Sequence, residues 1–183
     1  MGERDVNCYV VTCAQTRESI VIDPGDDPEK ILVQLAGLTV RWICFTHAHP
    51  GHVAAKEAVK AATGAPTAMH LADATANLKS ADRYLTGGDR LPFGQFVLEV
   101  LSTPGHSPGG LSYLVGNHLF TGDTLLQGKI GRVDIPGASP QQLVLSLHGQ
   151  LLGLPDNTVV YPGHGPNTTI GSERLHNPYL RLR

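Results

Sequence analysis

The chain has 183 residues, of which 41% are hydrophobic, and this size predicts a single domain spanning residues 1–183 with one sizeable core. A formal net charge of −2 and a pI near 6.5 argue against nucleic acid as the main partner, because phosphate binding needs a basic face. No apolar run reaches the roughly 20 residues that cross a bilayer, no secretory signal is present, and three cysteines form no CxxC pair, so we expect a cytoplasmic protein without a membrane partner.

The first half of the chain alternates predicted strands and helices. Residues 6–11 and 18–23 are short branched or aromatic runs around a polar turn, which predicts an antiparallel pair. Residues 26–35 carry helix-start chemistry, with Asp27 as the cap and Pro28 at the first helical position. Three further elements are predicted: a buried strand over 40–46, a helix over 52–63 and a short strand over 66–70. We assign no element to the polar stretch that comes after them.

The second half repeats this arrangement. Strands are predicted over 96–102, 111–115 and 118–122, followed by a helix over 139–152 and a strand over 158–161. Each half therefore runs strands, helix, strand, helix. This order predicts an α/β fold in which two sheets pack face to face with helices outside.

Four of these predicted strands end at a turn that is followed at once by a metal-ligand residue type. Side chains at neighbouring strand ends can converge on one point, where the scaffold holds them rigidly. Imidazole suits zinc and iron, and a carboxylate adds charge compensation. The residues in question are His47, His49 and His52 after the first of these strands, His106 after the second, Asp123 after the third and His164 after the fourth.

A single histidine after a strand is more often a hydrogen-bonded loop residue than a ligand. We interpret four of the nine histidines in that way, because they have neither ligand spacing nor a glycine turn: His70, His118, His148 and His176. For the other five histidines this interpretation would need several separate coincidences. Metal binding is therefore the favoured hypothesis for them.

Several motifs, in order along the chain, resemble the metal-binding motifs of the metallo-β-lactamase superfamily: THAHPGH, STPGHSPGG, FTGDTL and YPGHGP. The segments NCYVV and VIDPG and the tail GHGPNTTIGSERLHNPYL further resemble the short glyoxalase II-like hydrolases, the hydroxyacylglutathione hydrolase family. The match runs from Asn7 to Tyr179. It implies an αββα four-layer sandwich with the metals at one edge.

The resemblance also implies a role for each ligand. The residues that match the first metal site of the family are His47, His49 and His106, and those that match the second are His52 and His164. Asp123 matches the carboxylate that bridges both ions, and it can hold or accept a proton during catalysis. The family has an aspartate just before the third histidine of its first motif. Here that position is Gly51.

The glycine removes one negative charge from the second site. Three neutral imidazoles suffice for a catalytic zinc with an open position for water. Because two close cations repel each other, loss of the carboxylate weakens the second ion more than the first. We therefore expect one tightly bound Zn²⁺ and a second ion that is weak or absent, with Fe or Mn as the alternative metals, and lowered activity.

The expected reaction is hydrolysis of a small acyl thioester. The expected substrates include glutathione thioesters such as S-lactoylglutathione. A metal-activated water suffices for a thioester, whose thiolate leaves with little acid assistance. Lys129 and Arg132 are candidates for binding a glutathione carboxylate, although an arginine that only ties down its loop is an equal alternative. The longer family members hold glutathione with a C-terminal helical domain that this chain lacks, so we expect a more open pocket.

Two other functions stay open. One is a persulfide dioxygenase with a single non-haem iron, for which a mononuclear site would suffice. The other is a non-catalytic protein that binds metals or thiols, or a relative whose activity was lost with the aspartate. A serine triad is not expected, because no Gly-x-Ser-x-Gly motif is present. No sequence feature decides the oligomeric state.

Overall fold

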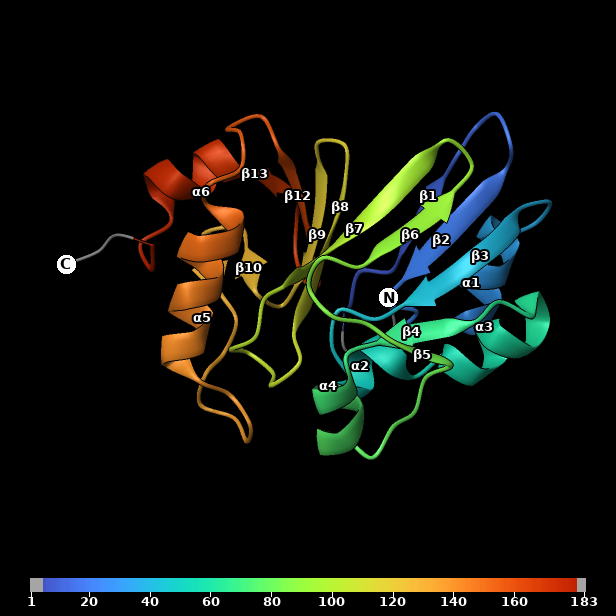
Figure 1. Ribbon diagram of the computed structural model, residues 1–183, viewed down its shortest axis with the longest axis horizontal. Coiled ribbons are helices and arrows are strands. Elements are labelled where there is room, and N and C mark those ends of the chain that lie inside the picture. Colours follow the sequence, from blue (N-terminus) through green and yellow to red (C-terminus); the bar gives the residue numbers. More distant parts are fainter. Residues whose placement is uncertain (1–4, 181–183) are drawn as a thin grey trace.

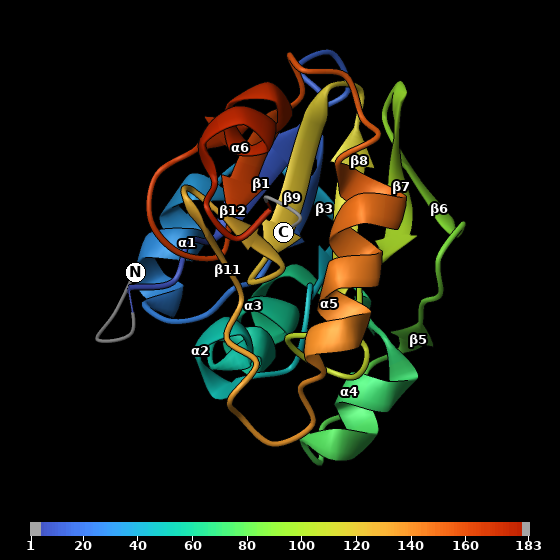
Figure 2. The same cartoon turned by 90° about the vertical axis from the view of Figure 1, so that its left-hand side faces the viewer.

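The computed structural model describes residues 5–180, and in it two β-sheets lie face to face between two groups of helices (Figure 1). Helices α5 (Pro140–Ser146) and α6 (Ile170–His176) cover one sheet, and α1 (Pro28–Gln34) and α3 (Lys56–Thr63) cover the other. The view turned by 90° shows the same layers from the side of α5 and α6 (Figure 2). The expected αββα sandwich is confirmed.

The first sheet contains five strands in the order β1-β2-β3-β4-β5. The first two strands pair antiparallel, as predicted, and each later neighbour pairs parallel. The strands are β1 (Tyr9–Thr12), β2 (Glu18–Ile22), β3 (Thr39–Cys44), β4 (Thr67–Met69) and β5 (Arg83–Tyr84).

The second sheet contains six strands in the order β13-β12-β9-β8-β7-β6. The predicted strands over 96–102, 111–115 and 118–122 are confirmed as β7, β8 and β9. A separate two-stranded ribbon, β10 (Leu125–Leu126) with β11 (Lys129–Ile130), follows β9 directly. The bounds are β6 (Arg90–Phe93), β7 (Phe96–Ser102), β8 (Leu111–Val115), β9 (His118–Gly122), β12 (Val159–Pro162) and β13 (Thr168–Thr169).

The core has separate apolar layers, one between the sheets and one under the helices of each side. In β2, Ile20 and Ile22 face the layer between the sheets, whereas Val21 faces the layer under α1 and α3. A strand buried on both faces reads as a continuous apolar run, which explains the sequence ESIVI. The hydroxyl of the buried Tyr113 donates to the carbonyl of Phe45 at 2.5 Å and links the two sheets.

The helix predicted over 52–63 is interrupted. The structure has α2 (Pro50–Val53) and then α3, because the Ala55 amide donates to the carbonyl of Pro24 at 3.1 Å instead of continuing the first helix. This tertiary contact has no local sequence signal. It ends α2 directly after the third histidine of the cluster.

Three further local predictions need correction. Asp27 occupies the N-cap position of α1, but its backbone is left-handed and its side chain caps nothing, since its carboxylate pairs with Lys30 at 2.8 Å. The helix predicted over 139–152 widens into a π-helix over Leu147–Leu151. The polar stretch without an assigned element contains α4 (Leu71–Ala76), β5 and β6.

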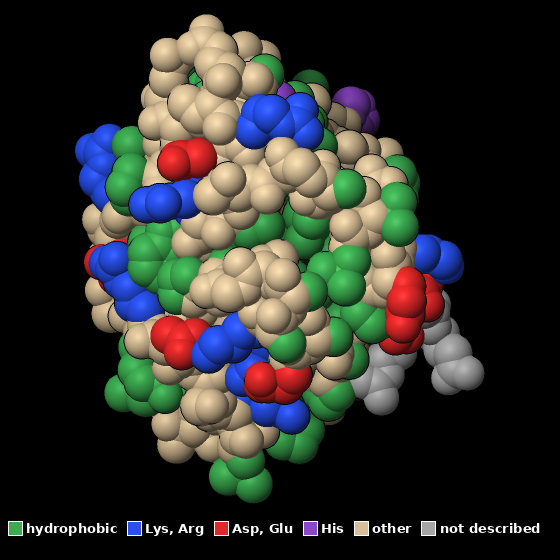
Figure 3. Space-filling view, turned by 90° about the vertical axis from the view of Figure 1, so that its right-hand side faces the viewer, with side chains coloured by type: hydrophobic (Ala, Val, Ile, Leu, Met, Phe, Trp, Pro, Cys, Tyr) green, Lys and Arg blue, Asp and Glu red, His purple; other side chains and the backbone are tan. Residues whose placement is uncertain are grey.

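The face that carries α1 and α3 shows charged side chains of both signs mixed with apolar ones (Figure 3). Ion pairs such as Lys30–Asp27 in α1 and Lys60–Asp82 beside α3 account for part of this pattern. Within residues 5–180, no helix is both long enough and apolar enough to cross a membrane.

Candidate metal centre

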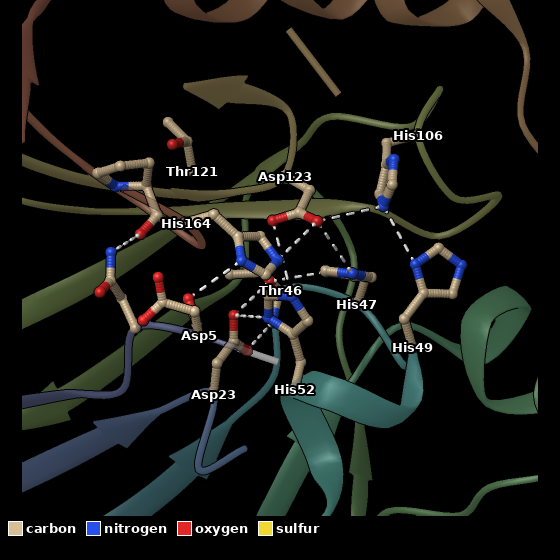
Figure 4. Close-up of polar contacts among 12 residues, drawn as sticks. Asp5, Asp23, Thr46, His47, His49, His52, His106, Thr121, Asp123 and His164 are labelled. Carbon is tan, nitrogen blue, oxygen red and sulfur yellow. Dashed lines mark hydrogen bonds and ion pairs between the residues drawn. The ribbon is translucent and has the colours of Figure 1, made fainter. Parts of the chain in front are cut away.

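The site lies where strands of both sheets end, and its side chains point toward one another (Figure 4). The segment after β3 and helix α2 supply three of them, and the loops after β7, β9 and β12 supply one each. The structure thus brings together all six residues expected to bind metal, which are His47, His49, His52, His106, Asp123 and His164.

The first group consists of His47, His49 and His106, whose ligand atoms all lie within 4.8 Å of one another. His49 Nδ1 is 3.0 Å from His106 Nε2. Oδ2 of Asp123 lies 3.5 Å from Nε2 of His106 and 4.0 Å from Nε2 of His47. Three imidazoles therefore converge beside one carboxylate.

The second group consists of His52, Asp123 and His164, again within 4.8 Å of one another. Oδ1 of Asp123 lies 3.6 Å from Nε2 of His52, and Oδ2 lies 3.4 Å from Nε2 of His164. The Asp123 carboxylate stands between the two groups. Its position is the one a bridging ligand would need.

The inward atoms of these residues fit a bound cation, because several are buried without a partner. His47 Nε2, His52 Nε2 and Asp123 Oδ1 have no hydrogen bond among the described residues. Buried polar atoms in proteins are nearly always satisfied. Unsatisfied lone pairs that point toward one another are what a metal site looks like without its ion.

The outer ring nitrogens fit the same interpretation. His106 Nδ1 donates to the carbonyl of Arg132 at 2.9 Å, and His164 Nδ1 donates to the carbonyl of Asp5 at 3.1 Å. Because a carbonyl only accepts, both rings carry a proton on Nδ1 and turn Nε2 toward the site. Such outer contacts fix the tautomer and direction of metal-binding histidines.

Asp23 is a residue of the site that the sequence reasoning missed. This buried carboxylate accepts from the backbone amide and the hydroxyl of Thr46 at 2.7 and 2.6 Å, and it lies 3.0 Å from Nδ1 of His52. Thr46 Oγ1 in turn lies 3.0 Å from Nδ1 of His47. Asp23 follows β2 and precedes Pro-Gly, so the same strand-end pattern that singled out the other ligands was the available signal.

The titration of the buried rings follows from their neighbours. Burial lowers the pKa of His47 well below its ordinary value. Burial also acts to lower the pKa of His52, but contacts with Asp123 and Asp23 outweigh it and raise that pKa to about 10. Burial would raise the pKa of Asp123, yet its contacts with His164 and His52 hold it well below the usual range. The Asp123 and Asp23 carboxylates therefore favour a positive charge at this point of the site.

Two glycines allow the backbone to approach the ligands. A Cβ on Gly163 would lie 2.3 Å from Oδ1 of Asp123 and 2.8 Å from Cε1 of His52. A Cβ on Gly131 would lie 1.9 Å from the carbonyl oxygen of Asp123. Side chains at these positions would displace the ligands, so the close approach requires glycine.

Gly51 lies in the first turn of α2, between the two ligand groups and a neighbouring cavity. It lines the cavity of about 320 Å³ that holds the ligands, and also one of about 460 Å³ that Lys56 and Lys79 line from the other side. The second group therefore has two imidazoles and the shared Asp123, without a carboxylate from position 51.

The two expected substrate-binding residues differ in position. Arg132 lines the cavity that holds the ligands, and its exposed side chain pairs with Asp134 at 3.0 Å. Lys129 is not among the residues that line this cavity, and its carbonyl accepts a hydrogen bond from Asn177. The geometry thus favours Arg132 over Lys129 for contact with a ligand.

The first described residues of the chain hold the loop of His164. Asn7 Nδ2 donates to the carbonyls of Pro162 and Gly165 at 3.0 and 2.8 Å, and the Tyr9 hydroxyl donates to Pro162 at 2.7 Å. Together with the contact between His164 and Asp5, these bonds form what we call the N-terminal clamp (Asp5, Asn7 and Tyr9). It fixes the ligand that comes last in the sequence.

Two curated relatives match almost the whole chain. The chain is 39% identical over 201 residues to the probable metallo-hydrolase YqgX of Bacillus subtilis, covering 98% of this chain and 94% of the relative. It is 30% identical over 199 residues to the hydroxyacylglutathione hydrolase GloC of Haemophilus influenzae, covering 97% and 93%.

Solved structures agree with this relationship. ETHE1 from Myxococcus xanthus has a TM-score of 0.90 at 35% identity, covering 97% of this chain and 80% of that one. The protein TTHA1623 in a di-iron-bound form has a TM-score of 0.85 at 40% identity, covering 98% of each chain. The model of the Metallo-beta-lactamase superfamily matches residues 1–164, which contain the complete set of converging ligands. The chain belongs to the Metallo-beta-lactamase superfamily.

Proposed function

We propose that the protein is a metal-dependent hydrolase of small acyl thioesters, with glutathione-derived thioesters such as S-lactoylglutathione as the first substrates to test. The observation that carries this proposal is the convergence of His47, His49 and His106 beside Asp123. Within residues 5–180, Nε2 of His47 and Oδ1 of Asp123 are buried there without a hydrogen-bond partner. Similarity to the hydroxyacylglutathione hydrolase GloC supports the substrate class.

The proposed chemistry divides between the ion and the chain. A dication bound by three imidazoles lowers the pKa of its water to about 7, which supplies a nucleophile at neutral pH, and it polarises a carbonyl. In this proposal Asp123 would hold the water by hydrogen bonding and accept its proton, a role that the position of its carboxylate beside both ligand groups supports. The thiolate needs little acid assistance when it leaves.

The chain supplies substrate orientation at the mouth of the same cavity. Arg132 and Ile135 line it beside the ligands, so the arginine can pair with a carboxylate while the isoleucine contacts an alkyl part of the substrate. Arg132 exchanges its present partner Asp134 for the substrate in this scheme. Because the side chains of Arg132 and Asp134 are both exposed, this exchange of partners requires little desolvation.

Gly51 sets the expected metal content. The first group keeps its full set of imidazoles, whereas the second has only one carboxylate, which it shares. We therefore propose one tightly held Zn²⁺, with a weaker second ion. The di-iron-bound TTHA1623 makes iron the first alternative metal to test.

The similarity to ETHE1 supports a second candidate function, that of a persulfide dioxygenase. The curated relative from Bos taurus, the mitochondrial persulfide dioxygenase ETHE1, is 30% identical over 183 residues and covers 95% of this chain and 71% of its own. A site with one strongly held ion would suit that reaction as well.

One set of assays separates these functions. Metal-free protein is loaded with Zn²⁺ or Fe²⁺, its metal content is measured, and each form is assayed for hydrolysis of S-lactoylglutathione and for oxygen uptake with glutathione persulfide. We expect hydrolysis that a chelator abolishes, with modest turnover. Oxygen uptake without hydrolysis would replace the hydrolase by the dioxygenase, and neither activity would favour a binding protein.

A further inference from the structure

Asp73 is a buried carboxylate that the proposed chemistry does not use. It lies in α4, its exposed fraction is 0%, and both its oxygens accept hydrogen bonds. Oδ2 accepts from the amide of Ala48 at 3.1 Å and from the hydroxyl of Ser107 at 2.9 Å, and Oδ1 accepts from the amide of Gly109 at 3.0 Å.

These three donors belong to the two segments that carry the first ligand group. Ala48 lies between His47 and His49, and Ser107 directly follows His106. The side chain of Asp73 therefore joins the two segments at a point one residue away from each ligand. A shift of this carboxylate would change the spacing between the imidazoles.

Close packing supports the same junction. A Cβ on Gly109 would lie 2.5 Å from Nδ1 of His70 and 2.8 Å from the backbone nitrogen of Asp73, so the loop after β7 rests directly on the start of α4. His70 Nδ1 in turn accepts from the amide of Ala72, which fixes the ring there. The loop and the helix cannot separate without loss of these contacts.

Within residues 5–180, no lysine, arginine or histidine forms an ion pair with the carboxylate of Asp73, which is contacted only by neutral donors. A buried carboxylate held only by neutral donors stays costly unless a positive charge lies near. The first ligand group is the adjacent place where a positive charge would be bound.

We propose that Asp73 is a positioning residue for the first metal ion: it sets the spacing of the two ligand segments and supplies negative charge behind them without contacting the ion. This inference rests on the metal centre of the proposed function. Residues of this kind in other metal sites change metal affinity by about 10- to 100-fold when they are replaced.

The test compares Asp73→Asn with wild-type protein and with Glu173→Gln. Glu173 is a matched control, because it is buried and accepts from the amide of Gly128 at 2.9 Å, from the hydroxyl of Thr168 at 2.7 Å and from the amide of Asn177 at 2.7 Å. Unlike Ala48 and Ser107, none of these donors is next to one of the six ligands in the sequence. Both replacements keep the shape of the side chain and remove its charge.

Three readouts are measured: the dissociation constant of the first Zn²⁺ by chelator competition, the absorption spectrum of the Co²⁺-loaded protein, and the melting temperature of the metal-free protein. For Asp73→Asn we expect about 10- to 100-fold weaker binding and an altered cobalt spectrum. For Glu173→Gln we expect a lower melting temperature with affinity within about twofold of wild type.

Ser107→Ala covers the case in which Asp73→Asn does not fold, since it removes one donor and leaves the carboxylate in place. It should weaken the first ion several-fold. Wild-type affinity and an unchanged cobalt spectrum in the folded variants, even with a lower melting temperature, would overturn the inference and leave the proposed function standing. Wild-type protein that binds no metal would overturn both.

Discussion

The two ligand groups share Asp123 but differ in how the chain supports them. In the first group the side chain of His47 is buried, with 3% exposed, and His106 is fixed by a hydrogen bond to the carbonyl of Arg132. The second group reaches the surface, because the side chain of His164 is 38% exposed and depends on the N-terminal clamp.

Their charges differ in the same direction. Asp73 lies behind the segments of the first group, and Gly51 takes the place where the family carries a carboxylate for the second. Asp23 contacts His52 of the second group, but position 51 supplies no carboxylate ligand there, so we expect the first group to hold its ion more tightly. The following changes test this expected difference in metal affinity.

The largest effect is expected for His106→Ala, which removes a ligand of the first group. Outer contacts alone change affinity by about 10- to 100-fold, so loss of a ligand should exceed that range and abolish hydrolysis. Metal content and thioester hydrolysis measure the change. His118→Ala, at a histidine that pairs with Tyr161 outside the ligand groups, is the control and should leave both unchanged.

Gly51→Asp should make the metal affinities of the two groups more nearly equal. A carboxylate at this position adds a ligand and a negative charge, and we expect the second ion to bind about tenfold more tightly or better. Titration of metal-free protein with Zn²⁺ measures both steps. Gly51→Asn separates charge from the loss of glycine flexibility, and equal second-ion affinity in all three proteins would remove Gly51 from the explanation.

Asn7→Ala should widen the difference in metal affinity between the two groups. Without the amide, the carbonyls of Pro162 and Gly165 each lose one donor, only the Tyr9 hydroxyl still binds Pro162, and we expect the His164 loop to loosen. We expect the second ion to weaken by up to about tenfold and the first to stay within twofold. Tyr9→Phe, which removes one hydroxyl of the clamp, should give a smaller change in the same titration. If both ions weakened equally, the clamp would not be specific to the second group.

The smallest effect is expected for Arg132→Ala. If its guanidinium binds a substrate carboxylate equally in the ground and transition states, KM rises several-fold while kcat changes little. Arg132→Lys retains the charge and should restore part of the affinity. Steady-state kinetics with S-lactoylglutathione and with a thioester that lacks the carboxylates tests this, because the second substrate should not distinguish the variants.

The convergence of the six candidate ligands could be predicted from the sequence because most of them follow a strand within a few residues. Apolar runs and glycine turns are local signals, and parallel or neighbouring strand ends meet at one edge of a sheet. The same signals located β7, β8 and β9. His47, His49, His106 and Asp123 can therefore be recognised from the order of residues alone.

The position of Asp23 at a strand end was a local signal, but the contacts that the supporting residues make could not be predicted in this way. Asp23 contacts residues that follow it by 23 and 29 positions, and Asp73 contacts one that precedes it by 25 and another that follows it by 34. The interruption between α2 and α3 likewise depends on the distant carbonyl of Pro24. Local propensity has no information about such partners, since tertiary contacts decide them.

The N-terminal clamp also links metal binding to the completion of folding. His164 Nδ1 meets the carbonyl of Asp5 across a separation of 159 residues, so this support of the second ligand group forms only after the N-terminal segment has reached the loop of His164. Contacts this distant in sequence are slow to form, because the intervening loop must close first. An ion that binds this group only when the contact is formed would stabilise the contact by mass action, so metal binding and closure of the N-terminal clamp should strengthen each other.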